Sequence, residues 1–549
     1  MKEFSSLTAL IIEPQSGMRM SIHNMLNLCE ITKIDHAVSA GTAIRQLQNK
    51  SFDLILCEYD LGEGQDGQQL LEDLRHNKLI PLWTIFIMVT AERQQQKVIS
   101  AAELAPTDYL LKPFTADSLL ERIARAVERR RLFMPIYTMM EHGSLAEAIA
   151  ACEAAEKTSP KFAIDFMRMR AELHVTLGQP AEAQQIYEQL QQIKAVAWAR
   201  LGLAKTLYMQ AKYKEAEELL NGIVAENPQF LDAYDWLAKA HEAVGQLPQA
   251  KDVLKDAVTI SPHAVRRLRK LGQVAYETGD VETAESSFQR VVTKAKYSEF
   301  RDPEDHVRLV KTLVKKGDTQ AAATVVRDME KSLGDSLKTP ACKAISAGLI
   351  HDANGDADRA AEEFAAAVAA CRTAVGLSNE TKLDLAKSCL ANNLQEGAEE
   401  VMLDVMNNSP DESAVAKAIS VFEATGHKDV AERVARESRK QVVELISGGA
   451  EKARSGDFRG AVELMIAAAH KLPDNPQVVF NAAVAVLKCL ENVGWDNRLG
   501  SNARWYIENA RRLDPTNPRL APLSELYSQI LKKYGILPAQ VMAKPPLRA

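Results

Sequence analysis

The sequence predicts two architectures in one chain: an α/β domain with a doubly wound parallel sheet, followed by an all-α superhelical solenoid of repeated helix pairs. Two observations carry this prediction. Residues 1 to about 131 alternate short apolar runs with amphipathic segments, which is the pattern of βαβ units. From Phe133 onward the strand signals stop, and alanine-rich helical periodicity continues nearly to the end. We therefore assign residues 1–131 to the first domain and residues 132–549 to the solenoid.

Four short runs in the first domain, rich in Ile, Leu and Val, have the length and the flanking turn residues of strands buried on both faces. They are Leu7–Ile12, Asp53–Cys57, Thr84–Val89 and Tyr109–Leu111. Helical patterns lie between them, for example at Ala40–Gln48 and Gln68–Arg75. Ligands of doubly wound sheets bind at the carboxyl ends of the strands, so these ends are where functional side chains are expected.

Composition excludes several classes of function. The 549 residues carry 67 Lys and Arg against 73 Asp and Glu, a net charge of −6, so there is no general positive field for nucleic acid or an anionic membrane. No apolar run approaches the roughly 20 residues that span a bilayer. The seven cysteines are dispersed and never in CxxC spacing, which favours reduced thiols over disulfides or a zinc site. We expect a cytoplasmic protein that neither binds nucleic acid nor inserts into a membrane.

Charged and polar residues follow the predicted strands at the positions where such a sheet binds ligands. Glu13 and Pro14 follow Leu7–Ile12, and Glu58 follows Asp53–Cys57. Thr90 follows Thr84–Val89, and Lys112 follows Tyr109–Leu111. Together with the stretches IFIMVTAE and DYLLKPFT, this constellation resembles the receiver domain of bacterial two-component response regulators. The resemblance covers the whole first domain and implies a flavodoxin-like fold with five parallel strands.

The resemblance also implies roles for these residues. In that family an acidic pair and an Asp hold Mg²⁺, and the Asp accepts a phosphoryl group. By position, Glu58 stands at the phosphoacceptor and Glu13 keeps one member of the acidic pair. Thr90 is the implied switch hydroxyl, Tyr109 the aromatic residue that moves with the switch, and Lys112 the charge partner of the acceptor.

Two departures from the family pattern predict a pseudo-receiver. Pro14 replaces the second acid and offers no oxygen to a cation that requires near-octahedral oxygen coordination. Glu58 replaces the Asp, and its extra methylene moves the carboxylate by roughly 1.5 Å, which disturbs in-line attack. Asp60 could become the acceptor only by a shift that places it beyond the strand end. Glu58 is either an inert carboxylate or a fixed negative charge beside Lys112.

The second domain repeats at a fixed period. Ala216, Ala250 and Ala284 are 34 residues apart, and Gly245 and Gly279 stand five residues before two of them. This pattern resembles the tetratricopeptide repeat (TPR), in which two antiparallel helices form each unit. Eleven second-helix registers can be followed, centred on Ala148, Ala183, Ala216, Ala250, Ala284, Ala322, Ala360, Ala398, Ala431, Ala461 and Ala503. We expect about ten to eleven repeats, of which the later ones are degenerate.

A solenoid of this kind offers a concave groove lined by its first helices, which suits protein or peptide partners. The candidate groove residues are Lys205, Tyr208, Lys239, Arg266, Arg269 and Tyr276. They do not form the ordered Lys and Asn set that some members of the family use to clamp a carboxylate. Trp198 and Trp236 fit packing between helices as well as a place in the groove.

No enzyme motif is present in the sequence, and no cofactor is expected. The predicted function is a signalling adaptor whose receiver-like domain works without phosphorylation. The main alternative is a phosphorylatable, Mg²⁺-dependent response regulator whose output is TPR-mediated binding, and a weaker one is a nucleic-acid-linked regulator that uses the basic clusters. Arg122, Arg125 and Arg129–Arg131 form either a solvated helix face or part of a homodimer surface of the receiver.

Overall fold

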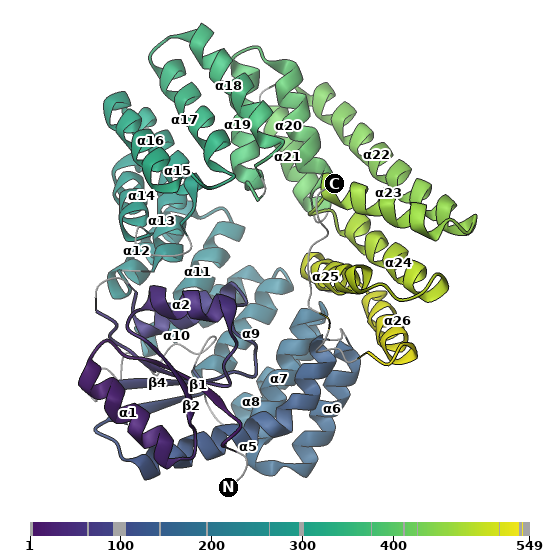
Figure 1. The fold of residues 1–549 in the computed structure, drawn as a ribbon. Helices are drawn as coiled ribbons and strands as arrows, with labels where there is room; N and C mark the ends of the chain where they lie inside the picture. Colours follow the sequence, from purple (N-terminus) through teal and green to yellow (C-terminus); the bar gives the residue numbers. More distant parts are fainter. Residues whose placement is uncertain are drawn as a thin grey trace. The chain divides into compact units, whose positions relative to one another are not determined.

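The computed structural model describes residues 4–62, 65–91, 106–141, 144–193, 196–262, 264–295, 301–374, 376–409, 412–424, 426–514, 517–536 and 541. The chain divides into two compact units. The first comprises Met1–Glu141 and Leu145–Asp305, and the second comprises His142–Ser144 and His306–Ala549. Figure 1 follows the chain from the sheet into the long series of helices.

The first unit begins with a five-stranded parallel sheet in the order β2-β1-β3-β4-β5. The strands are β1 (Thr8–Ile12), β2 (Lys33–Ala37), β3 (Leu54–Glu58), β4 (Ile85–Ala91) and β5 (Asp108–Lys112). The helices α1 (Ser16–Leu28), α2 (Ala40–Asn49) and α3 (Gly67–His76) lie between them in sequence. This arrangement confirms the predicted doubly wound sheet, whose parallel strands bring their carboxyl ends to one edge.

The sheet separates two apolar cores, because successive strand residues point to opposite faces. Ala9 and Ile11 of β1 belong to the core that contains residues of α1 and α5 (Ala116–Glu141). Leu10 and Ile12 belong to the other core, which contains residues of α2 and α3. Strands buried on both faces explain why these runs read as continuous apolar sequence.

β2 is the strand that the sequence analysis did not place. Its residues, Lys33–Ala37, read KIDHA, and only Ala37 is buried. β2 is an edge strand, paired on one side with β1. An edge strand tolerates polar residues, and β2, with Lys33, Asp35 and His36, lacks the apolar run by which the other four strands were located.

Among the described residues after Lys112, every regular element is a helix. The first unit contains α5, which continues across the predicted domain boundary at residue 131, followed by α6 (Leu145–Thr158), α7 (Ala163–Thr176), α8 (Pro180–Ile193), α9 (Ala197–Met209), α10 (Tyr213–Glu226), α11 (Leu231–Ala243), α12 (Leu247–Ile260), α13 (Val265–Glu277) and α14 (Val281–Ala295). The boundary between the two units falls within α15 (Pro303–Lys316).

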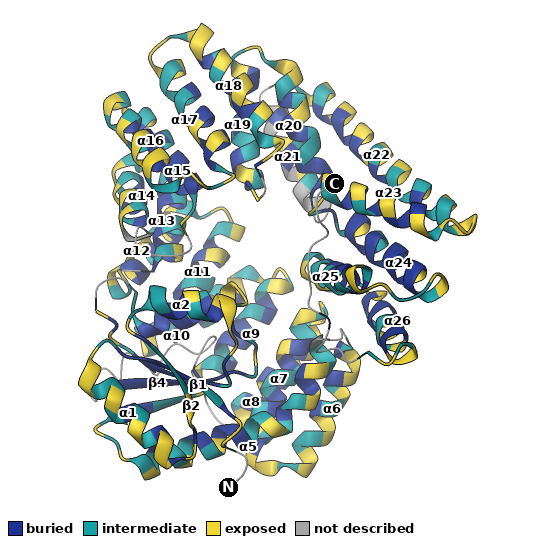
Figure 2. Cartoon of the chain, in the orientation of Figure 1, coloured by how far each residue is buried: buried dark blue, intermediate teal, exposed yellow. Residues whose placement is uncertain are grey.

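The second unit continues with α16 (Thr319–Leu333), α17 (Thr339–Ala353), α18 (Ala357–Cys371), α19 (Asn379–Ala391), α20 (Gln395–Asn407), α21 (Glu412–Ala424), α22 (Lys428–Arg454), α23 (Phe458–Lys471), α24 (Pro476–Asn492), α25 (Asn497–Leu513) and α26 (Leu520–Lys533). Figure 2 shows that these helices bury one side and expose the other. The predicted solenoid of helix pairs is confirmed.

The eleven alanines of the repeat register share one environment. Each lies on a helix and is at most 1% exposed. A side chain larger than alanine would hold two packed helices apart at these positions. One register deviates from a simple helix pair: α22 has 27 residues, from Lys428 to Arg454, and runs without interruption from the second helix of one repeat into the first helix of the next.

The turns inside the three central repeats each contain a residue in the left-handed region. Gly245 and Gly279, five residues before their alanines, have φ of +77° and +79°. Ala211 occupies the same place before Ala216 and has φ of 58°. A side chain at positive φ is strained, because its Cβ approaches the following carbonyl oxygen.

We predict that Ala211→Gly stabilises the repeat formed by α9 and α10 by about 1 kcal/mol, because it removes this backbone strain. The matched reverse change is Gly245→Ala, where an added Cβ meets no atom within 4 Å, so that only φ is altered. It should destabilise α11 and α12 by a similar amount. Native-state hydrogen exchange of the amides in these helices measures both effects. Equal exchange in Ala211→Gly and the wild type would contradict the strain argument.

Candidate functional site

The carboxyl edge of the sheet brings together the residues that the sequence singled out. Glu13 follows β1, Glu58 ends β3, Thr90 lies near the end of β4, and Lys112 ends β5. Glu13, Glu58 and Thr90 are buried, with exposures of 1%, 8% and 0%. They lie together because β1, β3, β4 and β5 are successive neighbours in the sheet.

The ammonium group of Lys112 joins the two carboxylates. Its Nζ donates to Glu13 Oε2 at 3.0 Å and to Glu58 Oε2. The other oxygens accept from loop amides: Glu13 Oε1 from the Gln15 N–H at 2.9 Å, and Glu58 Oε1 from the Asp60 N–H at 3.1 Å. Both oxygens of each carboxylate therefore already accept a hydrogen bond within the protein.

The electrostatics follow from this arrangement. Burial raises the pKa of Glu58, although the hydrogen bonds from Lys112 and from the Asp60 amide oppose the shift. Burial acts against the charged form of Lys112, but its bonds to Glu58 and Glu13 outweigh burial and raise its pKa. Lys112 thus remains an ammonium ion, and it stabilises negative charge on the two buried carboxylates.

The donor set does not fit the Mg²⁺ ion that the receiver resemblance implies. Pro14 offers no side-chain oxygen, and Glu13 and Glu58 both point toward Lys112. The guanidinium of Arg19 also donates to the carbonyl oxygens of Glu13 and Pro14, at 2.7 and 3.2 Å. Two cationic side chains therefore bind the oxygens that a hard cation would need.

The remaining receiver residues lie close to this site. The Thr90 side chain is fully buried, and Tyr109 packs against the core that α2 and α3 share. Burial raises the pKa of Tyr109, so its phenol stays neutral. Asp60 is exposed, and its Oδ1 accepts from the Gly62 N–H at 3.0 Å. The switch roles of Thr90 and Tyr109 stay predictions.

The predicted groove residues of the solenoid form two groups. Lys205 and Lys239 place their Nζ atoms 5.3 and 4.0 Å from the ring centroid of Trp236, and Tyr208 meets the same ring edge-on at 5.5 Å. We call Lys205, Tyr208, Trp236 and Lys239 the tryptophan cluster. The attraction between ammonium groups and the indole face holds both lysines at the same aromatic ring. Trp236 was singled out in the sequence but not assigned to the groove.

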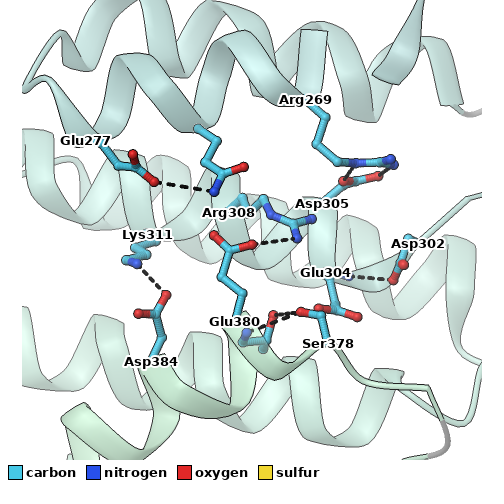
Figure 3. Close-up of polar contacts among 12 residues, drawn as sticks. Arg269, Glu277, Asp302, Glu304, Asp305, Arg308, Lys311, Ser378, Glu380 and Asp384 are labelled. Atoms are coloured by element: carbon cyan, nitrogen blue, oxygen red, sulfur yellow. Dashed lines mark hydrogen bonds and ion pairs between the residues drawn. The ribbon is translucent and has the colours of Figure 1, made fainter. Parts of the chain in front are cut away.

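The second group lies on α13. Arg269 is engaged by Asp305, with Nε and Nη2 bonds of 2.6 and 2.7 Å (Figure 3). Arg266 is exposed, and Tyr276 is partly buried on the same helix. Arg267, between Arg266 and the buried Leu268, was not predicted as a site residue but proves to be the most buried cation of this helix. The burial of Arg267 cannot be predicted from its place in the sequence, because its partners come from other helices.

The second unit contains similar ion pairs between helices. Figure 3 shows that Arg308 and Lys311 of α15 pair with Glu380 and Asp384 of α19, respectively. Charged residues on these first helices are therefore matched within the repeat array.

Three arginines at the end of the receiver are not simply solvated, which corrects one reading of the sequence. Arg122 pairs with Asp108 at 2.8 Å, and Arg129 pairs with Asp165 of α7 at 3.1 Å. Arg130 pairs at 2.9 Å with Asp53, whose other carboxylate oxygen accepts from Thr8 of β1. These pairs connect α5 to the sheet and to the first repeats, because residues distant in sequence meet there.

Comparisons with known proteins find similar proteins for both the receiver domain and the helical repeats. The response regulator receiver domain model matches residues 9–124, and two tetratricopeptide repeat models match residues 175–240 and 237–299. Over 120 residues the chain is 32% identical to the chemotaxis protein CheY of Pseudomonas aeruginosa. The aligned segment is 22% of this chain and 95% of that protein. Over 124 residues it is 28% identical to the chemotaxis protein CheY-3 of Vibrio cholerae, and the aligned segment is 23% of this chain and 94% of that protein.

A solved structure of the C-terminal part of a TPR repeat-containing protein from Cytophaga hutchinsonii is 15% identical, covering 46% of this chain and 98% of that one with a TM-score of 0.35.

The chain belongs to the response regulator receiver family through its first domain, which is fused to tetratricopeptide repeats. It therefore combines a signalling domain with a protein-interaction module. None of the described helices is long and apolar enough to span a bilayer.

We predict that Lys112→Met destabilises the receiver by roughly 3–5 kcal/mol, because it leaves Glu13 and Glu58 buried without their shared cation. Adding Glu58→Gln should recover part of the loss, since only one carboxylate then needs compensation. Lys33→Met, an exposed change on β2, is the matched control. Hydrogen exchange of β1 and β3 amides reports on the receiver within the full chain. A loss in Lys112→Met no larger than in Lys33→Met would refute the buried ion cluster.

Proposed function

We propose that this protein is a signalling adaptor in which a receiver-like domain works without phosphorylation and a TPR solenoid binds protein or peptide partners. The observation that carries the proposal is the donor set at the implied phosphoacceptor, where Pro14 stands in place of an acidic ligand and both oxygens of Glu58 already accept hydrogen bonds. The proposal also includes a cytoplasmic location and the absence of enzymatic activity, of a cofactor and of nucleic-acid binding. A homodimer formed through the receiver stays a prediction.

The chemistry of the site supports phosphorylation independence. A carboxylate that accepts a phosphoryl group needs a free oxygen in line with the donor and a cation that neutralises the transferred group. Both oxygens of Glu58 already accept hydrogen bonds, Pro14 stands in place of an acidic metal ligand, and the guanidinium of Arg19 donates to the Pro14 carbonyl oxygen. A permanent Glu58 charge beside Lys112 instead favours one arrangement of the receiver continuously.

We predict that the full chain gains no phosphoryl group from acetyl phosphate in the presence of Mg²⁺, as measured by intact mass. Pro14→Asp combined with Glu58→Asp restores the acidic ligands and should restore a measurable fraction of phosphorylated protein. Glu58→Gln is the negative control. A donor-dependent mass increase in the wild type that disappears in Glu58→Gln would favour the alternative function, a phosphorylatable response regulator.

Partner binding is expected to depend on the tryptophan cluster, where two ammonium groups and two aromatic rings lie together on the first helices α9 and α11. Such a cluster suits a partner segment that carries carboxylates, because the lysines can exchange the ring face for an anion. The double change Lys205→Glu with Lys239→Glu should reduce partner capture from a cell extract at least tenfold.

The matched control is Lys214→Glu with Lys255→Glu, which makes the same charge change at exposed residues of the second helices α10 and α12. Quantitative mass spectrometry of the captured proteins compares the two variants with the wild type. Equal losses in both double variants would show that net charge matters rather than the groove.

A further inference from the structure

Helix α3 of the receiver is buried on its polar side as well as on its apolar side. Leu70, Leu71 and Leu74 pack into the receiver core. Gln68 and Gln69 are polar, yet they are only 9% and 7% exposed. A surface helix normally leaves such residues in water, so another part of the chain covers this face of α3.

The covering part belongs to the solenoid of the same compact unit. Glu72 Oε2 of α3 lies 4.0 Å from Nη1 of Arg267 on α13. The Arg267 side chain is 6% exposed and also binds Asp235 of α11, with Nε–Oδ1 and Nη2–Oδ2 distances of 3.0 and 2.9 Å. Asp232 Oδ1 lies 3.8 Å from the same guanidinium. The receiver therefore meets α13, a first helix of its repeat that is expected to line the groove, through a guanidinium that α11 also binds.

Arg266 and Arg269, which the sequence assigned to the groove, lie on the same helix as Arg267 and act electrostatically on this face of α3. Arg266 and Arg269 both favour the charged form of Asp73, the neighbour of Glu72 on α3, and so oppose the rise in pKa that burial causes there. The polar face of α3, defined by Gln68, Glu72 and Asp73, is thus matched to the arginines of α13.

The match is incomplete. Both amide atoms of Gln68 are buried without a hydrogen-bond partner among the described residues. Glu72, Asp232 and Asp235 all place a carboxylate oxygen within 4.0 Å of the guanidinium of Arg267. Burial raises the pKa of Glu72 to about 7, although Arg267 lowers it, because Asp232 and Asp235 already compensate that cation. This contact leaves one amide without a partner and places three carboxylates around one guanidinium. A helix that satisfies these groups better can therefore replace α3.

We propose that α3 occupies the ligand groove of the solenoid from within the same chain, and that the protein partner displaces it with an amphipathic helix whose polar face carries amide and carboxylate side chains. This inference rests on the proposed function of the solenoid as a protein-binding module. Covalent linkage gives α3 a high effective concentration, so an imperfect contact suffices to hold it and a tighter partner can still displace it.

The test uses the full chain and a fluorescein-labelled peptide of residues 65–78 that carries Glu72→Gln, with binding followed by fluorescence anisotropy. Glu72→Lys in the protein repels Arg267, releases α3 and should tighten peptide binding at least tenfold. Glu72→Gln in the protein removes surplus acid, strengthens the internal contact and should weaken peptide binding relative to the wild type. Opposite shifts cannot come from general destabilisation. Glu121→Lys, at an exposed residue of α5, is the control and should bind as the wild type does.

The internal contact should also depend on pH. Glu72 has a pKa of about 7 in the contact and an ordinary value of 4.5 when α3 is released, so the contact is strongest when Glu72 is protonated and weakens as pH rises through 7. The groups that face Glu72 are Arg266 and Arg267 of α13 and Asp232 and Asp235 of α11. Burial also raises the pKa of Asp66 at the N-terminus of α3 to about 6, and Arg267 opposes this rise.

Between pH 6 and pH 8 the internal contact should weaken about tenfold, which follows from the two pKa values of Glu72. The peptide, which lacks this carboxyl group, should therefore bind the wild type more tightly at pH 8, while its binding to the Glu72→Gln protein stays nearly constant. Equal affinities of all variants, or no peptide binding to any of them, would overturn the proposal. If the Lys205 and Lys239 variants still lose partners in that case, the proposed function stands and only the α3 contact is refuted.

Discussion

The ion cluster of Glu13, Glu58 and Lys112 determines what the receiver domain can do. Parallel strands bring these three side chains to one edge of the sheet, where two carboxylates are buried around one ammonium. Two buried carboxylates are tolerated because Lys112 and the loop amides satisfy all four oxygens. The receiver fold is thereby retained, while the oxygens needed for metal and phosphoryl chemistry already have partners.

Buried and half-buried cations are paired with carboxylates elsewhere in the chain as well. Three carboxylates lie at the guanidinium of Arg267, and Arg269 binds Asp305. Arg130 connects α5 to the sheet through its ion pair with Asp53. Buried or half-buried pairs of this kind add little net stability, but breaking one partner is costly. A ligand that replaces one partner by another avoids that cost. Binding by exchange therefore suits this protein better than binding to an open, unpaired surface, and α3 is the element placed to be exchanged.

Much of the fold was predictable because it depends on short-range patterns. Four apolar strands, the Gly-to-Ala spacing of the repeats and the strand-end residues are all visible in the sequence. β2 was missed because its polar sequence, KIDHA, forms no apolar run, and the fusion of two repeat helices in α22 was missed because the alanine register does not show whether a turn separates successive helices. The partners of Arg267 and Arg129 could not be predicted, since they lie on helices distant in sequence, and only tertiary packing selects them.

We propose that the Lys112 ammonium takes the place of a divalent cation at the receiver site. Calorimetric titration of Mg²⁺ into the full chain tests it most directly, with Pro14→Asp combined with Glu58→Asp as the comparison. The account predicts no saturable heat for the wild type and a one-site isotherm for the double variant. A one-site isotherm in the wild type that disappears in Glu58→Gln would contradict the account.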